Sequence, residues 1–349
     1  MSKNEDIGFA IVGTGGIAAI YLDAIRQVPG ADLRAVYNRS LKKAEEFVLD
    51  SSVEVEVSFD ALLERDDIDV VCVTTPSGAH SEVAIPAMEA GKHVLCEKPL
   101  EVTVEKVDQI IETAEITGCI LAVVFQSRFS PEARLLKEAI NMGRFGRLTL
   151  CSAYIKWWRD DAYYSSADWR GTWKLDGGGA LMNQGIHYVD LLQWLVGMPE
   201  SVFAYCATLS HDDVEVEDTA VVSMRYPGGA LGVIESSTSS YPGFERRIEI
   251  VGDKGSVVLE DNRIESWHFS EEFPEDERIR LDDPKVDISG GTSDPRAIST
   301  EGHRLQIMDL VDAIREKRAP TISGSEGRKA VQVVQAVYES AWKGEAVEL

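Results

Sequence analysis

Short apolar runs and amphipathic stretches alternate along the first third of the chain. The apolar runs predict buried strands, and they lie at residues 7–12, 33–37, 70–74, 93–96 and 120–124. The stretches between them predict helices, one ending near residue 28 and the others at residues 42–49, 80–90 and 104–117. Strands that alternate with helices predict a parallel, doubly wound sheet. We therefore expect an α/β domain over residues 1–126.

The pattern changes near residue 127. After a predicted helix at residues 131–141, strand candidates follow one another without intervening helices, at residues 148–158, 202–209, 219–226, 230–237, 247–251, 256–259 and 264–269. Such a succession implies a mainly antiparallel sheet. We expect a second, α+β domain over residues 127–349 with a large open-faced sheet. Terminal helices near residues 304–315 and 328–343 are expected to return and pack near the first domain.

The segment from Asp176 to Gly197 is predicted to be one helix that begins at three glycines. Asn183, His187, Asp190 and Trp194 recur along it at helical spacing, which places them on one face. The other faces are apolar, so the helix is expected to be buried. Its polar stripe then has two interpretations: a set of paired core residues, or the lining of a cleft.

A glycine-rich loop follows the first predicted strand. It consists of Gly13, Thr14, Gly15, Gly16, Ile17 and Ala18. In the spacing GxGxxA, the first glycine permits a tight turn, the second lets the backbone approach a pyrophosphate, and the alanine allows close packing of helix on strand. The phosphates are expected at the N-terminus of the next helix. Because it lies between the first strand and the first helix, this motif predicts a Rossmann dinucleotide site.

The end of the second predicted strand bears on the choice between NAD and NADP. An NAD site usually has a carboxylate there for the ribose 2′-hydroxyl. This chain has Asn38, Arg39 and Ser40 instead. Arg39 beside a hydroxyl suits a 2′-phosphate, so NADP is slightly favoured. In the alternative, Arg39 is a solvated turn residue and NAD binds through Asn38.

Several further motifs follow the glycine-rich loop in a fixed order. They are Thr75-Pro76 with His80, Glu97-Lys98-Pro99, Gln126-Ser127-Arg128-Phe129, Trp169-Arg170, and the glycine-led helix with His187. Together they resemble the glucose–fructose oxidoreductase and inositol dehydrogenase family (Gfo/Idh/MocA). The resemblance spans residues 7 to 190 and is specific for the family, but it says little about the substrate.

The resemblance implies roles for individual residues. Lys98 is expected near the nicotinamide and the reacting hydroxyl. The family commonly has an aspartate and, four residues later, a histidine on one helix, and these positions are Asn183 and His187 here. Asn183 can bind a sugar hydroxyl but cannot act as a base. Besides the residues of the two loops already named, the positions matched to the cofactor are Thr75, Pro76, His80, Glu97, Lys98, Gln126, Trp169 and Arg170.

The expected chemistry follows from the side chains themselves. Removal of a hydride from a carbinol carbon needs a nearby group that takes the hydroxyl proton. His187 suits that role, because imidazole titrates near pH ~6.5. Lys98 can stabilise the developing alkoxide. The alternative for Lys98 is an exposed lysine after a strand, and for His187 a satisfied core histidine.

The segment at residues 157–173 concentrates tryptophan, tyrosine and arginine just before the glycine-led helix. Aromatic faces stack on the C–H faces of sugars, while arginine and tyrosine tips bind hydroxyls or carboxylates. The alternative is a packed cap over the core. The substrate-binding candidates are Arg128, Arg159, Tyr163, Tyr164, Asn183 and His187.

Composition narrows the classes of partner. The net charge of −24 argues against nucleic acid and anionic membranes as partners. The five cysteines are scattered, with no metal-binding spacing, which favours a reducing compartment. We expect a cytoplasmic protein without a metal. The acidic segment at residues 271–300 is expected to be a long loop that covers the cleft or reaches a neighbouring subunit, and a homodimer or homotetramer is expected.

The leading hypothesis is an NAD(P)-dependent oxidoreductase that acts on a secondary alcohol of a sugar, cyclitol or sugar derivative. Two alternatives stand beside it: an NAD-using glycosidase on the same scaffold, and a non-catalytic cofactor or sugar sensor. A sensor has no need of the lysine and the histidine, which are both present here as Lys98 and His187.

Overall fold

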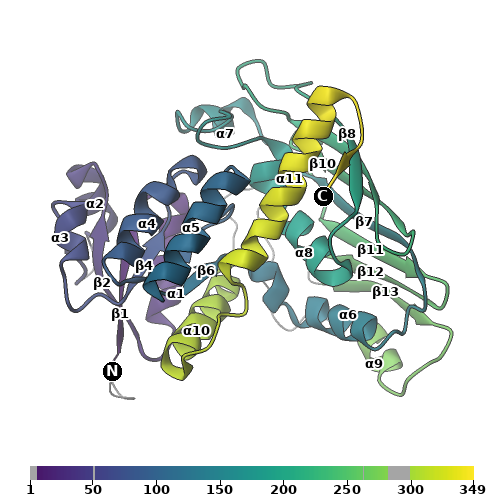
Figure 1. The fold of residues 1–349 in the computed structure, drawn as a ribbon, viewed down its shortest axis with the longest axis horizontal. Coiled ribbons are helices and arrows are strands. Elements are labelled where there is room, and N and C mark those ends of the chain that lie inside the picture. The colour runs from purple at the N-terminus through teal and green to yellow at the C-terminus, as the bar shows by residue number, and fades with distance from the viewer. Residues whose placement is uncertain (1–5, 50–51, 262, 282–298) are drawn as a thin grey trace. The chain divides into compact units, whose positions relative to one another are not determined.

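The computed structural model describes residues 6–49, 52–261, 263–281 and 299–349. The chain forms two compact units (Figure 1). The first contains residues 1–126 and 299–328, and the second contains residues 127–298 and 329–349. Within the described ranges, no helix has both the length and the apolar character needed to cross a bilayer.

The first unit is built on a parallel sheet with the strand order β3-β2-β1-β4-β5-β6. The strands are β1 (Ile7–Val12), β2 (Ala31–Tyr37), β3 (Glu54–Val55), β4 (Val70–Val73), β5 (His93–Cys96) and β6 (Leu121–Val123). Every residue of β1 is buried, so both faces of the sheet are covered there. The order changes direction at β1, which has β2 on one side and β4 on the other. This confirms the expected doubly wound sheet.

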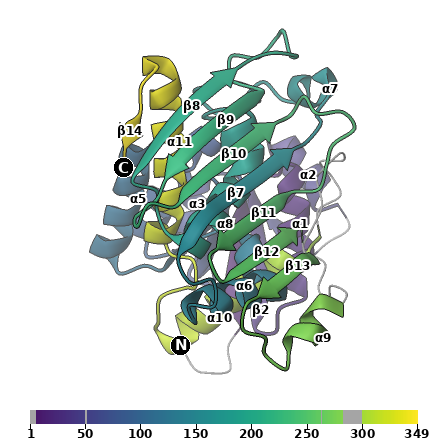
Figure 2. The same ribbon diagram turned by 90° about the vertical axis from the view of Figure 1, so that its right-hand side faces the viewer.

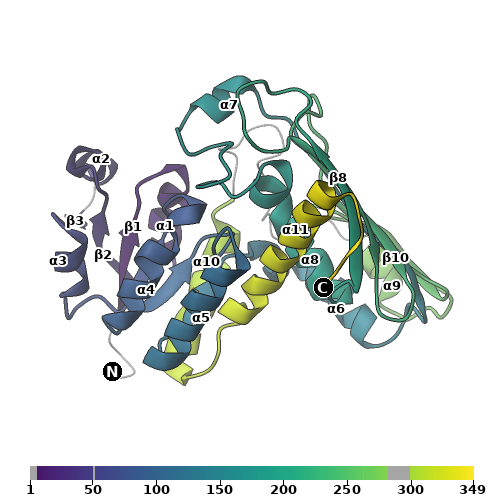
Figure 3. The same ribbon diagram turned by 45° about the horizontal axis from the view of Figure 1, so that its top comes forward.

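Helices and short turns complete the first unit. They are α1 (Gly16–Arg26), α2 (Leu41–Phe47), α3 (Phe59–Leu63), η1 (Ser77–Ala79), α4 (Ser81–Glu89), α5 (Val104–Thr117) and α10 (Glu301–Glu316). Figures 1 and 3 show α4 and α5 side by side, and they contact one another. Helix α10 packs on α1, and its Ile307, Leu310 and Val311 belong to the core that contains Ala18 and Ile25.

The second unit contains a sheet with the order β13-β12-β11-β7-β10-β9-β8-β14 (Figure 2). Its strands are β7 (Leu148–Lys156), β8 (Ser201–Ala207), β9 (Thr219–Arg225), β10 (Leu231–Ser237), β11 (Arg247–Gly252), β12 (Gly255–Glu260), β13 (Arg263–Phe269) and β14 (Val347–Glu348). All neighbours are antiparallel except β7 and β10, which confirms the mainly antiparallel sheet.

The two faces of this second sheet differ. One face carries buried residues such as Ala153, Val222 and Ile234, and it packs on α8 and η3. The other exposes the large apolar residues Leu150, Tyr205, Val221 and Leu231. The expected homo-oligomer would use this exposed face, and its formation stays a prediction.

The helical segments of the second unit are η2 (Gln126–Phe129), α6 (Pro131–Asn141), α7 (Asp161–Ser165), η3 (Ala180–Gly185), α8 (Ile186–Val196), α9 (Asp276–Leu281) and α11 (Gly324–Lys343). Helix η2 begins on the last residue of the first unit, and α11 likewise belongs to both units, with its first residues in the first and the remainder in the second.

Two expectations are corrected here. The segment expected as one helix from the glycines to Gly197 is a wider π-helical turn, η3, followed by the α-helix α8, because contacts from the sheet fix its glycine-led start. The acidic segment expected to be a loop contains α9, because Asp276 binds Arg144 and the indole of Trp267. The remainder of that segment, residues 282–298, lies outside the described residues.

Candidate functional site

The first part of the candidate site is the loop between β1 and α1. The backbone of Gly13 has a φ of +101°, and its N–H donates to the Tyr37 carbonyl at 2.9 Å. A Cβ added at this position would stand 2.8 Å from the Thr74 carbonyl oxygen. Glycine is therefore required here, both for the turn and for the close approach of β4.

The next two glycines lie in open space. A Cβ at Gly15 or Gly16 would meet no atom within 4 Å. The first turn of α1 carries no acidic residue, and Gly15 provides no side-chain cap for its amides. A helix N-terminus with exposed amides and no competing carboxylate suits a phosphate group.

The end of β2 supplies the next predicted residues. The Asn38 side chain donates to Thr14 Oγ1 at 2.8 Å and accepts from the Ser40 backbone N–H at 2.9 Å. Ser40 caps α2. Arg39 is exposed and has no hydrogen bond or ion pair to the described part of the chain. Of these three residues only Arg39 carries a charge, and its guanidinium is available for a ligand.

The loops after β4 and β5 are joined by His80. Its Nδ1 lies 2.8 Å from the Pro99 carbonyl oxygen and its Nε2 lies 3.0 Å from the Thr75 carbonyl oxygen. Burial lowers the pKa of His80, and the neutral imidazole carries a single N–H, so it donates to one of these two carbonyl oxygens at a time. His80 thus holds the position of the loop that contains Lys98, whose side chain is partly exposed.

Glu97 has partners that the sequence did not reveal. Its Oε1 accepts from the Tyr21 hydroxyl at 3.0 Å and lies 3.4 Å from Nε2 of His303, on α10. Burial opposes ionisation, but the hydrogen bond from His303 and the nearby Lys98 hold the pKa of Glu97 below its usual range. The structure gives Glu97 an internal role behind Lys98, and its predicted contact with the cofactor stays a prediction.

Two unsatisfied polar atoms, one after β4 and one after β6, support a ligand site in the first unit. Thr75 Oγ1 and Gln126 Oε1 are buried and have no hydrogen-bond partner among the described residues. Buried polar groups are normally paired, so unpaired ones at a predicted ligand site call for an explanation. With the open glycines and the bare helix terminus, they fit the adenine–nicotinamide dinucleotide expected from the GxGxxA motif. Pro76 lies in the loop after β4, next to Thr75, and Ile17 lies in the first turn of α1.

The second part of the candidate site lies in the second unit, at the glycine-led segment. Glu217 clamps its start: Oε2 accepts from Gly179 N–H at 2.9 Å, and Oε1 accepts from Leu181 N–H at 2.8 Å and from the Tyr338 hydroxyl at 3.0 Å. A Cβ at Gly179 would stand 1.7 Å from the Glu217 carbonyl oxygen. The glycine is therefore a packing requirement of this clamp.

Asn183 and His187 follow this clamp. The amide nitrogen of Asn183 donates to Asp176 Oδ1 at 2.6 Å, and the other oxygen of Asp176 accepts from Gly171 N–H at 2.9 Å. Asp176 is 1% exposed. His187 lies in the first turn of α8 and is 8% exposed. Asp176 was not among the predicted site residues, since its contact with Asn183 depends on the turn between them.

Two arginines surround Tyr163 beside this segment. The guanidinium carbon of Arg170 lies 4.2 Å from the centre of the Tyr163 ring, and that of Arg159 lies 5.3 Å from it. The Tyr163 hydroxyl accepts from Arg170 Nη1 at 2.5 Å and from Gln184 Nε2 at 3.0 Å. Burial lowers the pKa of Arg159, and the neighbouring Arg170 acts in the same direction.

Arg170 also connects to the expected aromatic residues. Its guanidinium lies 4.7 Å from the ring centre of Trp169, and its Nε is buried without a partner in the described ranges. Two cations around one phenol, with a donor N–H unsatisfied, are chemically suited to an anionic group.

Two predicted substrate residues have internal partners instead. Arg128 is 2% exposed and forms a bidentate ion pair with Asp190, with N–O distances of 2.8 and 2.6 Å. The Tyr164 hydroxyl pairs with Thr238 Oγ1 at 2.8 Å, and its ring packs on His211. These contacts place the polar groups of both residues in the interior of the second unit, and their contact with a substrate stays a prediction.

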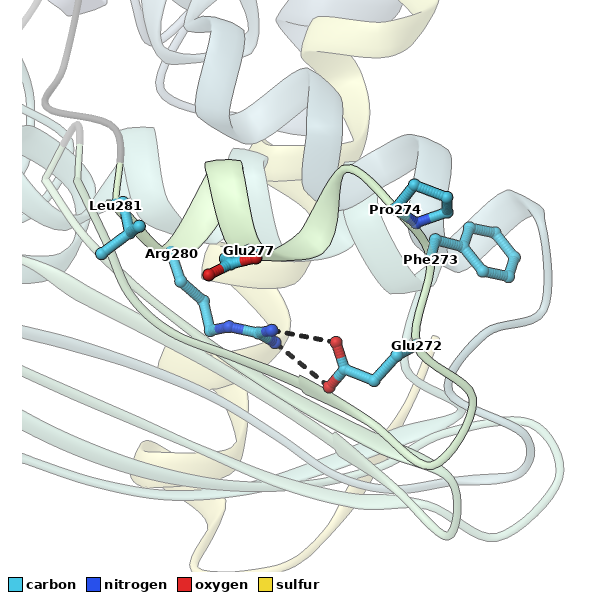
Figure 4. A pocket seen from close by; sticks show the side chains of 6 residues that line it. All are labelled: Glu272, Phe273, Pro274, Glu277, Arg280 and Leu281. Carbon is cyan, nitrogen blue, oxygen red and sulfur yellow. Dashed lines mark hydrogen bonds and ion pairs between the residues drawn. The ribbon is translucent and has the colours of Figure 1, made fainter.

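A separate hollow of the second unit lies beside α9 (Figure 4). It is lined by Glu272, Phe273, Pro274, Glu277, Arg280 and Leu281. Arg280 and Glu272 pair within it at 2.9 Å. None of these residues is a site candidate. Among the residues that the structure describes, no group of His, Cys, Asp and Glu side chains is arranged to hold a metal ion.

Comparison with known protein families gives two matches. The family described as "Oxidoreductase family, NAD-binding Rossmann fold" matches residues 7–125, and the "GFO/IDH/MocA C-terminal domain" matches residues 133–258. Together with the parallel sheet and its glycine loop, these matches define an NAD-binding oxidoreductase. The two matches cover most of the chain, which therefore belongs to the Gfo/Idh/MocA family.

Individual relatives agree with this assignment. The WlbA dehydrogenase of Bordetella pertussis, solved in complex with NADH and UDP-GlcNAcA, is 34% identical, with 99% of this chain and 98% of that chain covered and a TM-score of 0.90. The WlbA dehydrogenase of Chromobacterium violaceum, with the same two ligands, is 36% identical, with 99% and 97% covered and a TM-score of 0.89. The scyllo-inositol 2-dehydrogenase (NADP(+)) IolU of Bacillus subtilis (strain 168) is 30% identical, over 80% of this chain and 84% of that protein.

Proposed function

We propose that the protein transfers a hydride between NAD(H) and a ring carbinol of a sugar that carries a carboxylate. The observation that carries this proposal is the pair of arginines around Tyr163, which borders the segment with Asn183. In a chain with a net charge of −24, two adjacent and largely buried cations favour an anionic ligand. UDP-GlcNAcA is the first candidate, because it is the sugar ligand of two relatives at 34% and 36% identity.

The first unit would hold the cofactor. The open loop at Gly15 and Gly16 and the N-terminus of α1 would take the pyrophosphate, and Thr75 and Gln126 would satisfy their buried oxygens on it. The bound nicotinamide supplies the position that accepts or returns the hydride. Trp169 stays a predicted cofactor contact by resemblance.

Two residues of this chain would handle the proton. When the carbinol is oxidised, the hydrogen on its carbon would leave with both electrons of the C–H bond to the nicotinamide, and its O–H proton would pass to the imidazole of His187. The Lys98 ammonium would stabilise the negative charge on the oxygen as the carbonyl forms. In the reverse direction His187 returns the proton to the alkoxide. Asn183 would bind a neighbouring hydroxyl or N–H of the sugar.

The function is tested by turnover with matched sugars. We expect NADH formation, followed at 340 nm, with UDP-GlcNAcA, and a much higher KM with the neutral UDP-GlcNAc. Arg170→Met should raise the KM for the acid by about 10- to 100-fold, the range expected for one charge-assisted contact, and change the KM for the neutral sugar little. Arg225→Ala, an exposed arginine on β9, is the matched control.

The outcomes separate the alternatives. Turnover of neutral sugars that equals or exceeds that of the acid would contradict the carboxylate proposal. If Arg170→Met lowered only the affinity for NADH, Arg170 would be assigned to cofactor binding. Release of the sugar without net NADH would identify the glycosidase, and cofactor binding without turnover of any sugar would identify the sensor.

The cofactor preference depends on Arg39. The relatives differ in their cofactor: the two WlbA structures contain NADH, whereas IolU is named for NADP(+). Arg39→Ala is expected to weaken NADP by about 10-fold or more and NAD by less than about 2-fold, because only the 2′-phosphate offers the guanidinium a charged partner. Fluorescence titration with both cofactors measures this. If Arg39→Ala changed the affinities for NAD and NADP equally, Arg39 would be a solvated residue without a role in cofactor choice.

A further inference from the structure

The hydrogen bond between Asp176 and Asn183 fixes the orientation of the Asn183 amide. The two side chains meet at 2.6 Å, and Asp176 is buried at the base of the glycine-led segment. A carboxylate oxygen can only accept, so the Asn183 atom that faces Asp176 is the amide nitrogen. The carbonyl Oδ1 of Asn183 then lies on the opposite side of the amide from Asp176.

Protein donors, rather than water, bind both oxygens of the Asp176 carboxylate. Its second oxygen accepts from the Gly171 N–H at 2.9 Å, so both carboxylate oxygens are held by donors. A charge-assisted hydrogen bond to a buried carboxylate is about twice as strong as a neutral one. The orientation of the Asn183 amide is therefore fixed by a residue that itself lies away from the solvent.

We propose that Asp176 is a positioning residue that makes Asn183 a hydrogen-bond acceptor for the substrate. The substrate group that meets Asn183 is then a donor, either a ring hydroxyl or an N–H such as that of an acetamido substituent. The inference rests on the proposed function, in that it names the polarity of one contact in the same site.

The Asp176→Asn variant exchanges donor and acceptor in the hydrogen bond between positions 176 and 183. The introduced amide keeps its oxygen on the Gly171 N–H and turns its nitrogen to Asn183, which must flip and present Nδ2 to the substrate. We expect kcat/KM to fall by about 10- to 100-fold, mainly through KM. Asn183→Asp brings two carboxylates into contact, so kcat/KM should fall at pH 8 and recover as the pH is lowered and the pair takes up a proton.

The double variant Asp176→Asn/Asn183→Asp restores the pair with donor and acceptor exchanged. The amide introduced at position 176 then donates to the carboxylate introduced at position 183 and accepts from Gly171, while that carboxylate still presents an oxygen to the substrate. We expect kcat/KM within about 10-fold of the wild type, and the pH dependence of the single Asn183→Asp variant should disappear. Asp212→Asn, an exposed aspartate of the same unit, is the matched control and should leave kcat/KM unchanged.

Two results would overturn the inference. One is a double variant that is no more active than the weaker single variant. The other is an Asp176→Asn variant with wild-type KM. Thermal unfolding gives a readout that does not depend on turnover: each single substitution should lower Tm and the double variant should recover it. If the wild type turned over no substrate, the proposed function would fall, and additive Tm losses would still overturn the pairing on their own.

Discussion

Replacing His187 by alanine is expected to lower kcat about 100-fold or more while leaving NADH affinity within about 2-fold of the wild type. The reason is that, in the proposed mechanism, His187 takes the hydroxyl proton, and no other imidazole is proposed for that step. Lys98→Ala should have an effect of the same order, because the proposed mechanism gives its ammonium the role of stabilising the alkoxide. Steady-state kinetics at 340 nm and fluorescence titration of NADH measure the two quantities separately.

Matched substitutions and chemical rescue sharpen this test. His268→Ala and Lys254→Ala change exposed residues of the same types and should leave kcat unchanged. Added imidazole should restore part of the turnover of His187→Ala, since a free base can then take the proton. Near-normal turnover in both the His187 and Lys98 variants would remove the assignment. A loss of NADH affinity that accompanies the loss of kcat would instead indicate a cofactor role.

Glu217 is expected to make the second unit less stable as the pH rises towards neutrality. Burial raises the pKa of Glu217 from 4.5 to about 7, although hydrogen bonds from Leu181, Gly179 and Tyr338 oppose the shift. Between these two values the folded protein keeps a proton that the unfolded chain has released. The free energy of unfolding should therefore fall by about 1.4 kcal/mol per pH unit over most of this window and level off above about pH 7.

The comparison with Glu217→Gln isolates this contribution. The difference in unfolding free energy between wild type and variant should fall by about 2 kcal/mol between about pH 5.5 and about pH 7. All seven tryptophans lie in the second unit, so their fluorescence during urea unfolding reports on that unit. Glu200→Gln, an exposed glutamate, is the control and should show a constant difference. A constant difference for Glu217→Gln as well would contradict the raised pKa.

Most of the fold followed from local patterns. The predicted strand at residues 7–12 was identified because both faces of β1 are buried and every position is therefore apolar. The predicted helix at residues 104–117 matches α5, whose ends are set by the cap of Thr103 and the left-handed Gly118. In contrast, the two-residue strand β3 and the short helix α3 were missed, because neither is long enough to establish a periodicity.

The candidate site could be predicted only in part. The GxGxxA loop, Lys98 and His187 could be proposed from the sequence because each lies in a local motif, and the roles of Lys98 and His187 stay predictions. Tyr21 and His303 could not be proposed in this way, since they meet Glu97 only through the fold, from positions 76 and 206 residues away along the chain. Glu217 was hidden for the same reason: it is one acid among many in the sequence, and its raised pKa arises from burial beneath Gly179 and Tyr338.

The division of the chain has a consequence for its synthesis on the ribosome. The first unit is interrupted in sequence, because α10, which packs on α1, comes only after strands β7 to β13 of the second unit have been made. The 172 residues between the two parts, 127 to 298, take about 9–34 seconds to translate at about 5–20 residues per second. During that interval the core that contains Ala18 and Ile25 of α1 lacks the α10 residues Ile307, Leu310 and Val311. The nascent chain is therefore expected to need protection by a chaperone at this stage, and its nucleotide-binding unit cannot be completed until residue 328 has been made.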